Sequence, residues 1–328
     1  ELVDRFLEDA TEVDVDVITD GDDSVVGAIM EHIEEAGIHS GDSACVIPPF
    51  SLSEKIKDEI SDAAKALAKK LEVRGLMNIQ FAVKDEELFV IEVNPRASRT
   101  VPFVSKTIGV PLAKLAAKVM AGEKLKDLGF TKEIYPEHYS VKEAVFPFVK
   151  FPGTDIVLGP EMKATGEVMG IDADLGLAYA KSQMAASSPL PTKGNIFISL
   201  KDRDKEKAID IIKEYHELGF NLFSTAGTAK VIENSGIPVT KLFKLAEKRR
   251  PNVLDMIKNE ELDFVINTPS TERTPRADEV KIRSSAVANG NPVMTNLRAA
   301  KASALAIRSL KSNDTQVKTI QEFHSEIT

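Results

Sequence analysis

The chain has 328 residues, of which 43% are hydrophobic and 28% are charged, so it can bury a substantial core and is long enough for two domains. Its single cysteine, Cys45, excludes an internal disulfide and a zinc site built from several cysteines, and it fits a reducing, cytoplasmic location. No stretch approaches the ~18 apolar residues of a membrane span. Because the first residue is Glu1 and no leader follows, we expect the chain to begin inside a longer polypeptide.

The net charge of −9 is unevenly distributed along the chain. Residues 1–187 contain 20 Lys and Arg against 33 Asp and Glu, whereas residues 188–328 contain 22 against 18. This asymmetry predicts two domains with different ligands, of which the second would attract a small anion. Neither half has a basic run interleaved with aromatic residues, so nucleic-acid binding is not expected. The Pro- and Ser-containing stretch at 187–192 is a predicted linker, which gives domains at 1–187 and 188–328.

The first half is predicted to mix strands and helices. Acids alternate with valines within residues 7–21, which predicts a strand that is either a solvated sheet edge or an acidic face beside a metal–nucleotide site. A glycine-containing loop follows at 37–43. Helical spacing of apolar residues predicts an amphipathic helix over 53–72 and a second helix over 111–121. Further strands are expected at 76–84, 88–93, 139–149 and 166–171, the first two forming a hairpin around the polar loop 85–87.

The second half is predicted to alternate strands with helices. Such alternation with short connections is typical of a small parallel sheet covered on both faces. The strands are expected at 195–200, 220–224, 238–243, 262–267 and 292–295. The helices are expected at 204–218, 227–235, 252–260, 278–289 and 297–311. The two halves together predict an α+β domain followed by an α/β domain.

The predicted hairpin carries polar residues that could hold a metal ion. Glu92 and Asn94 are two residues apart and share a face of the strand. If paired residues have numbers that sum to 172, Gln80 lies opposite Glu92 and Asn78 opposite Asn94. One carboxylate and three amide oxygens then gather on otherwise apolar strands, where a hard cation such as Mg²⁺ would satisfy them. The alternative is a sheet end whose polar residues meet solvent.

Two basic residues and the histidines bear on which ligand such a site would take. Arg96 and Arg99 follow the second strand closely and would suit a polyphosphate. The five histidines are scattered without metal-binding spacing, so zinc is not expected. The sequence contains neither a Walker-type phosphate loop nor a Gly-x-Gly-x-x-Gly motif.

The hairpin sequence resembles a known family. Residues 75–83 (GLMNIQFAV) and 89–106 (FVIEVNPRASRTVPFVSK) resemble the ATP-grasp core of the carbamoyl-phosphate synthetase large chains, and residues 29–44 and 139–148 resemble the same family. The resemblance implies that residues 1–187 are the C-terminal part of an ATP-grasp domain. The preceding lobe, with its glycine-rich loop and phosphate-pairing lysine, is not in the sequence, so the chain alone is expected to be incomplete and inactive.

The resemblance also implies roles for individual residues. Gln80, Glu92 and Asn94 would hold Mg²⁺ or Mn²⁺ on the phosphates of the substrate ATP. Arg96 and Arg99 would be catalytic, steadying the transferring phosphoryl group, since phosphoryl transfer requires positioning and charge neutralisation. Glu12 would bind the ribose, and two residues would lie near the adenine. The complete ATP-binding set would be Arg5, Leu7, Glu12, Gly37, Ile38, His39, Ser40, Gln80 and Glu92.

In the second half, small polar residues gather where predicted strands end. Ser199 ends the first strand, the sequence Ser-Thr-Ala-Gly-Thr at 224–228 follows the second, and Asn267 ends the fourth. The carboxyl ends of strands bind ligands in open α/β sheets, and free backbone N–H groups at a helix start can hold a phosphate, although a simple capped helix start is the alternative.

These residues resemble the methylglyoxal-synthase-like, Rossmann-like regulatory domain of the same large chains. The resemblance implies a nucleotide monophosphate effector bound by Ser199, Lys205, Thr225, Thr228, Lys244, Asn267 and Thr268. The loop at 267–270 lacks the aspartates that the lyase uses, so lyase activity is not expected.

The combined interpretation is the C-terminal part of a carbamoyl-phosphate synthetase large chain, an ATP-dependent ligase. It would contribute the phosphorylation of carbamate within an enzyme that serves arginine and pyrimidine synthesis from bicarbonate, ammonia or glutamine, and two ATP. The implied partners are a glutamine amidotransferase small chain and the remainder of the large chain, in an oligomer. Two alternatives stay open: another ATP-grasp ligase of the biotin-carboxylase kind, which should lack the second domain, and a non-catalytic module that binds effector and contacts subunits.

Overall fold

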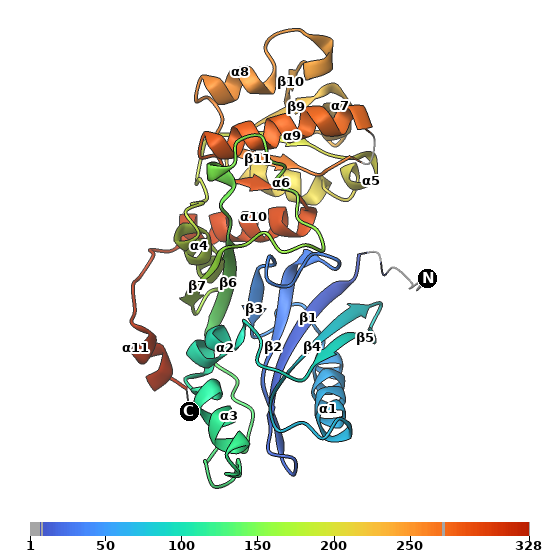
Figure 1. The fold of residues 1–328 in the computed structure, drawn as a ribbon. Coiled ribbons are helices and arrows are strands. Elements are labelled where there is room, and N and C mark those ends of the chain that lie inside the picture. Colours follow the sequence, from blue (N-terminus) through green and yellow to red (C-terminus); the bar gives the residue numbers. More distant parts are fainter. Residues whose placement is uncertain (1–6, 8, 271–272, 328) are drawn as a thin grey trace. The chain divides into compact units, whose positions relative to one another are not determined.

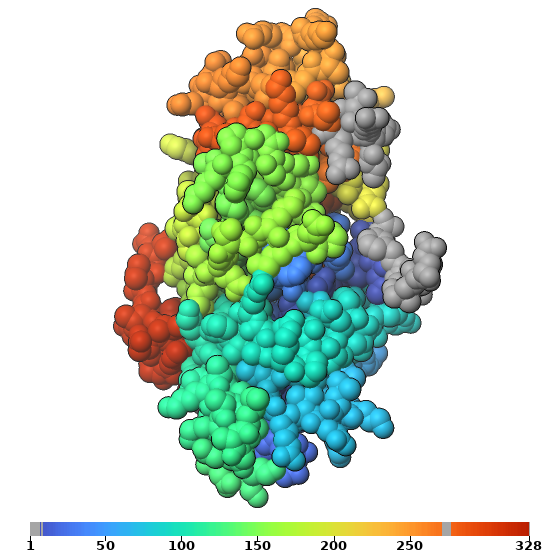
Figure 2. All heavy atoms as spheres, viewed as in Figure 1, coloured from blue at the N-terminus to red at the C-terminus, as the bar shows by residue number. Residues whose placement is uncertain are grey.

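The computed structural model describes residues 7, 9–270 and 273–327, and for residues 273–276 it describes the backbone alone. The chain divides into two compact units (Figures 1 and 2). Unit 1 comprises residues 1–143, 171–175 and 316–328, and unit 2 comprises residues 144–170 and 176–315. The chain passes between the units more than once, so this division does not test the predicted domain boundary at 187/188, which stays a prediction.

Unit 1 is built around a sheet of seven strands in the order β5-β4-β1-β2-β3-β6-β7, whose last strands lead along the chain into unit 2. The pairs from β5 to β6 are antiparallel. The strands are β1 (Thr11–Thr19), β2 (Ser24–Glu35), β3 (Cys45–Ile47), β4 (Gly75–Lys84), β5 (Glu87–Asn94), β6 (Tyr139–Val145) and β7 (Gly166–Asp172). The helices of unit 1 are α1 (Glu54–Lys70), α2 (Val101–Ile108), α3 (Leu112–Met120) and α11 (Ile320–Ser325). Helix α4 (Leu175–Ala185), apart from its first residue, and the short 3₁₀ turn η1 (Phe148–Lys150) belong to unit 2.

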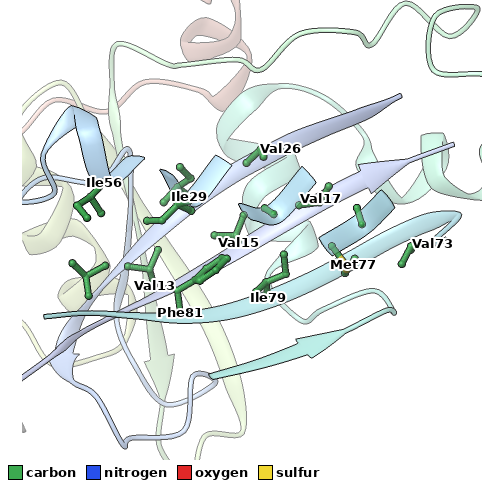
Figure 3. Packing of buried hydrophobic residues seen from close by; sticks show 14 residues of the cluster. Val13, Val15, Val17, Val26, Ile29, Ile56, Val73, Met77, Ile79 and Phe81 are labelled. Carbon is green, nitrogen blue, oxygen red and sulfur yellow. The ribbon is translucent and has the colours of Figure 1, made fainter. Parts of the chain in front are cut away.

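The alternating sequence of β1 places its valines and its acids on opposite faces. Val13, Val15 and Val17 are fully buried and pack with apolar residues of β4 and α1 (Figure 3). The acids are also buried, and β1 lies between β2 and β4 in the middle of the sheet. Of the two interpretations of this strand, the solvated sheet edge is therefore wrong.

Helix α1 confirms the predicted amphipathic helix. Ser53 caps its N-terminus by accepting a hydrogen bond from the Ile56 amide, and lysines in the last turn complement the helix dipole. Ile56 and Ile60, one turn apart, are fully buried against the sheet. The hairpin of β4 and β5 and the helix α3 are likewise confirmed.

Several elements differ from the sequence prediction. Strands β2 and β3 and helices α2, α4 and α11 were not predicted. The strand expected over 139–149 ends at Val145, before Pro147, which cannot donate to a sheet. The helix expected over 204–218 is interrupted between α5 (Asp202–Lys205) and α6 (Ile209–Glu217).

Unit 2 contains the predicted parallel sheet, with its five strands in the order β10-β9-β8-β11-β12. The strands are β8 (Asn195–Ser199), β9 (Asn221–Thr225), β10 (Thr240–Leu242), β11 (Phe264–Asn267) and β12 (Val293–Met294). The other helices are α7 (Ala226–Asn234), α8 (Val253–Lys258), α9 (Arg273–Ala288), α10 (Leu297–Ser312) and the 3₁₀ turn η2 (Leu245–Glu247). The strand order reverses at β8, which makes the carboxyl ends of β8, β9 and β11 the topological switch point, where such sheets bind ligands.

In the part of the chain that the structure describes, no helix combines the length and the apolar composition that crossing a bilayer requires.

Candidate functional site

The strand register in unit 1 aligns polar residues in two rows across β1, β4 and β5. Gln80 pairs with Asp14 on one side and with Glu92 on the other. Asn78 pairs in the same way with Asp16 and Asn94. The predicted register, in which paired numbers sum to 172, is confirmed for both pairs of the hairpin, and paired residues of neighbouring strands point to the same face.

The outer end of this polar face has the oxygen atoms that a hard cation requires. Glu92 is exposed on β5, and its Oε1 accepts a hydrogen bond of 2.8 Å from Asn94 Nδ2. Gln80 donates its Nε2 to Ser40 Oγ at 2.8 Å, which leaves its amide oxygen for another partner. A carboxylate and two amide oxygens at one accessible edge fit a divalent cation such as Mg²⁺. Asn78 is buried, and its Nδ2 donates to Asp16 Oδ1 at 3.0 Å, so its side chain links β4 to β1.

The loop at 37–40 is held against the same face. The Gly37 amide donates to Glu12 Oε2 at 3.4 Å, and Ser40 accepts the bond from Gln80. Lys142 Nζ on β6 donates to the Ser40 carbonyl at 3.3 Å. The structure thus brings together Glu12 with Gly37, and Ser40 with Gln80. Ile38 and His39 are half-buried in the same loop, and Leu7 is also half-buried, whereas Arg5 lies outside the described residues.

Burial and charge shape the electrostatics of this face. Burial raises the pKa of Glu12 above its ordinary value; Asp14 and Glu92 raise it further, while His32 and the Gly37 amide lower it. Several carboxylates therefore repel one another here. A cation or a nucleotide–metal complex would relieve that repulsion.

Arg96 and Arg99 are exposed on the loop that follows β5, and a buried carboxylate holds that loop in place. Asp16 accepts hydrogen bonds of 2.7 Å from Ser98 Oγ and of 2.7 Å from Thr100 Oγ1. Sequence reasoning missed this role of Asp16. The hydroxyl residues that flank the arginine were its only signal.

A second feature that sequence reasoning missed is a buried cluster of Asp14, His32 and Cys45. His32 Nε2 lies 3.1 Å from Asp14 Oδ2, and one side-chain atom of each of the three residues lies within 4.8 Å of the others. Burial lowers the pKa of His32, but Cys45 and Asp14 outweigh it and raise that pKa well above its ordinary value. The raised pKa favours the protonated imidazolium, which would place a positive charge beside the acids of β1. The cluster depends on the pairing of β2 with β3, which the sequence did not predict.

In unit 2 a cavity of about 580 Å³ opens at the predicted switch point. Five of the seven predicted effector-binding residues line it: Ser199, Lys205, Thr225, Thr228 and Lys244. Lys201, in the turn after β8, and Arg203, in α5, add positive charge to its wall, whereas Asp202, Asp278 and Glu279 add negative charge.

The cavity combines cations with the N-terminus of α7. A Cβ atom added to Gly227, in the first turn of α7, would lie 3.2 Å from Lys205 Nζ. The ammonium group therefore stands beside the free N–H groups of that helix start, an arrangement suited to an anion. Lys205 currently pairs with Asp202 Oδ1 at 2.5 Å. On another wall, Phe243 stacks with Arg249, whose guanidinium carbon lies 3.9 Å from the ring centroid.

The other two predicted residues, Asn267 and Thr268, are fully buried beneath the cavity. Asn267 Nδ2 donates to the Ser199 carbonyl at 3.0 Å, and Thr268 Oγ1 accepts from the Lys201 amide at 2.9 Å. Thr228 Oγ1 similarly accepts from the Leu200 amide at 3.2 Å. These three side chains fix the turn after β8, which forms the cavity floor.

Each half of the chain matches a known protein family. Residues 1–128 match the family described as "Carbamoyl-phosphate synthase L chain, ATP binding domain", and residues 207–295 match the family described as "MGS-like domain". The carbamoyl phosphate synthase large chain of Rhodopirellula baltica is 54% identical over 99% of this chain and 30% of its own length. The chain resembles the C-terminal part of carbamoyl phosphate synthase large chains.

Other relatives agree with this assignment. The large chain of Archaeoglobus fulgidus is 52% identical over 99% of this chain and 30% of its own length. A relative in Methanocaldococcus jannaschii, "Carbamoyl phosphate synthase large chain, C-terminal section", is 48% identical over 99% of this chain and 54% of its own length. The chain thus spans about a third of the large chains and about half of that section. Among solved structures, the biotin carboxylase domain of a single-chain bacterial carboxylase gives a TM-score of 0.46 at 19% identity, covering 56% of this chain and 48% of that one.

Proposed function

We propose that this chain is the C-terminal part of a carbamoyl phosphate synthase large chain. In that role, residues 1–187 contribute to the ATP-dependent phosphorylation of carbamate, and residues 188–328 bind a regulatory nucleotide. The single observation that carries the proposal is the coexistence, in one chain similar to these synthases, of the Gln80–Glu92 oxygen site and the cationic cavity at the β8 switch point.

In unit 1, Gln80, Glu92 and Asn94 would hold Mg²⁺ or Mn²⁺ on the phosphates of ATP. The bound ion would neutralise phosphate charge during transfer. Glu12 and the loop at 37–40, with Arg5 and Leu7, would contact the nucleoside.

Phosphoryl transfer depends on positioning and on charge stabilisation, which the loop after β5 can supply. Arg96 and Arg99 are exposed there, so their guanidinium groups can reach an acyl-phosphate oxygen. The hydrogen bonds from Ser98 and Thr100 to Asp16 keep this loop at the end of the polar face.

In unit 2, the cavity would take a nucleotide monophosphate. Its volume of about 580 Å³ suits a small molecule, and Lys205 with the start of α7 offers a site for the phosphate. Thr225, Thr228, Ser199 and Lys244 would complete the site, with Asn267 and Thr268 beneath it.

The match of residues 207–295 to the MGS-like family argues against a ligase of the biotin-carboxylase kind, which should lack this domain. For the chain in isolation we keep the second interpretation, a non-catalytic module that binds effector and contacts subunits. The partners we propose are the glutamine amidotransferase small chain and the rest of the large chain, within a cytoplasmic oligomer.

The synthetic role is tested by Glu92→Ala in a full-length synthase that contains this chain. Loss of the carboxylate should reduce ATP formation from ADP and carbamoyl phosphate by at least about 100-fold, because the metal–phosphate complex loses its charged ligand. Glu87→Ala, an exposed acid on the same strand, is the matched control and should leave the rate unchanged. Near-normal activity of Glu92→Ala would show that this oxygen site is not the metal site.

The regulatory role is tested by calorimetry of this chain with UMP and IMP. We expect one of them to bind, and Lys205→Gln to weaken it by at least about tenfold through loss of the ammonium–phosphate contact. Lys258→Gln, an exposed lysine on α8, serves as the control. If neither nucleotide binds, the effector proposal fails. If the chain alone makes ATP from ADP and carbamoyl phosphate, the non-catalytic interpretation of the isolated chain fails.

A further inference from the structure

Arg283, on α9, is fully buried in unit 2. Its Nε and Nη2 donate to the two carboxylate oxygens of Asp155 at 2.9 and 2.8 Å. Its Nη1 donates to Asn267 Oδ1 at 2.7 Å and lies 3.7 Å from Glu279 Oε2. A single guanidinium thus binds a residue of its own helix, a residue at the end of β11 and, in Asp155, a residue that is distant in the sequence.

Two of these groups belong to the proposed effector cavity. Asn267 holds the turn after β8 through the Ser199 carbonyl, directly beneath the cavity. Glu279 lines the cavity itself and accepts a hydrogen bond of 2.9 Å from the Ser270 amide. A ligand that presses on the cavity floor, or whose phosphate repels Glu279, therefore acts on partners of Arg283.

The third group organises a different segment, residues 146–165, which leads from β6 to β7. Asp155 Oδ1 accepts from the Val157 amide at 3.3 Å. Lys163 Nζ donates to the Val157 carbonyl at 2.7 Å and to the Asp155 carbonyl at 3.4 Å. The η1 turn of this segment packs against α9, and Figure 2 shows the light green residues of this segment on the surface beside orange residues of unit 2.

The geometry of the arginine side chain restricts how Arg283 can move relative to Asp155, Asn267 and Glu279. The planar guanidinium offers its donors in a fixed fork, and the bidentate pair with Asp155 restricts its orientation. Because the group is fully buried, water does not replace a lost partner, and a shift of Asn267 or Glu279 must be followed by a shift of Arg283 and Asp155.

We propose that Arg283 is a positioning residue that transmits occupancy of the cavity to residues 146–165. The inference rests on the effector role proposed above. Since this segment is covalently continuous with β6, which carries Lys142 and its bond to the Ser40 carbonyl, it offers an effector a route to the polar face of unit 1. Arg283 needs no contact with the ligand for this role.

The test is amide hydrogen exchange of this chain with and without UMP and IMP. In the wild-type protein, bound nucleotide should slow exchange at 226–229, in the cavity wall, and also at 148–157. Asp155→Asn and Arg283→Lys both remove the bidentate pair, and Arg283→Lys keeps the buried charge. In both variants nucleotide should still bind within about tenfold of the wild-type Kd and protect 226–229, but exchange at 148–157 should change less than twofold. Glu161→Gln, an exposed acid of the same segment, should behave as wild type.

The outcomes separate the two proposals. If neither nucleotide binds the wild-type chain, the effector role fails, and this inference fails with it. If nucleotide binds but leaves 148–157 unprotected in the wild type, or protects it equally in Asp155→Asn, the transmission through Arg283 is overturned while the effector role stands. Should Arg283→Lys not fold, Asp155→Asn decides alone, because it leaves the contacts of Arg283 with Asn267 and Glu279 in place.

Discussion

At the scale of single residues, Asp16 is a buried carboxylate that holds a loop of the candidate site. Its side chain is 1% exposed and accepts hydrogen bonds from Asn78, Ser98 and Thr100. Burial raises the pKa of Asp16 to about 6, although these three hydrogen bonds lower it. The carboxylate therefore positions the Arg96 loop at a cost in stability when it is ionised.

This raised pKa predicts a pH dependence of stability. The folded state binds the Asp16 proton more tightly than the unfolded chain, whose ordinary value is 3.8. As pH rises from about 4 to 6, the free energy of unfolding should fall, and above pH 6 this contribution levels off. The limit is about 3 kcal/mol, at roughly 1.4 kcal/mol per pKa unit.

Urea denaturation between pH 4 and 8 measures this effect against Asp16→Asn, which cannot ionise. Relative to that variant, the wild type should lose stability across the window. Asp23→Asn, at an exposed position, should instead run parallel to the wild type. Parallel curves for Asp16→Asn and wild type would mean that Asp16 has an ordinary pKa in the folded protein.

The sequence predicted the positions of individual side chains correctly where a local spacing determines which face of a strand they share. Spacing by two residues placed Glu92 and Asn94, and the hairpin register then placed Gln80. It failed for His32, because its partners Asp14 and Cys45 lie on different strands and meet only through sheet pairings with no local signal. Sequence reasoning also placed Asn267 and Thr268 at the end of a strand, but it did not show that both are buried beneath the cavity.

At the scale of elements, the same reasoning explains which strands and helices were predicted. Helix α1 has one apolar and one polar side, which gives its sequence a helical period. The β4–β5 hairpin has a short polar turn, which marks the boundary between its two strands. Strand β2 is buried on both faces along nearly its whole length, and α4 is buried on most sides. An element covered all round has no exposed face to create a period, which is why these two were missed.

The packing of α4 against β7 predicts the effect of one substitution. A Cβ atom at Gly170 would lie 2.1 Å from the Ala178 carbonyl oxygen and 2.5 Å from the Ser182 amide nitrogen. Both are backbone atoms of α4 and cannot move independently. Gly170→Ala should therefore lower the free energy of unfolding by more than about 2 kcal/mol.

Gly166, on the same strand, provides the matched control for this experiment. Its added Cβ would meet only Val145 Cβ at 4.0 Å, an ordinary contact. Gly166→Ala should change stability by less than about 0.5 kcal/mol in thermal or urea denaturation. Equal stability of the two variants would contradict the close packing of β7 and α4.

At the scale of the whole molecule, the two compact units have separate cores. Residues of β1, β4 and α1 form one cluster, whereas residues of β8, β11, α8 and α9 form another. The charge asymmetry in the sequence anticipates the different chemistry of the units, with acidic rows in unit 1 and lysines around the cavity of unit 2. Composition did not anticipate that the 144–170 segment packs with unit 2, because contacts such as the Arg283–Asp155 pair join residues that are distant in the sequence.

Separate cores predict that a ligand of unit 2 stabilises that unit selectively. A nucleotide present at 100 times its Kd stabilises the folded state by about 2.7 kcal/mol, which lowers the open population roughly 100-fold. The most protected amides of β8, which exchange through unfolding of unit 2, should then exchange about 100-fold more slowly with UMP or IMP, whichever binds. Those of β1 should change less than about threefold. An equal slowing in β1 and β8 would instead show that the cores unfold together, because only shared unfolding lets a ligand of one core protect the other.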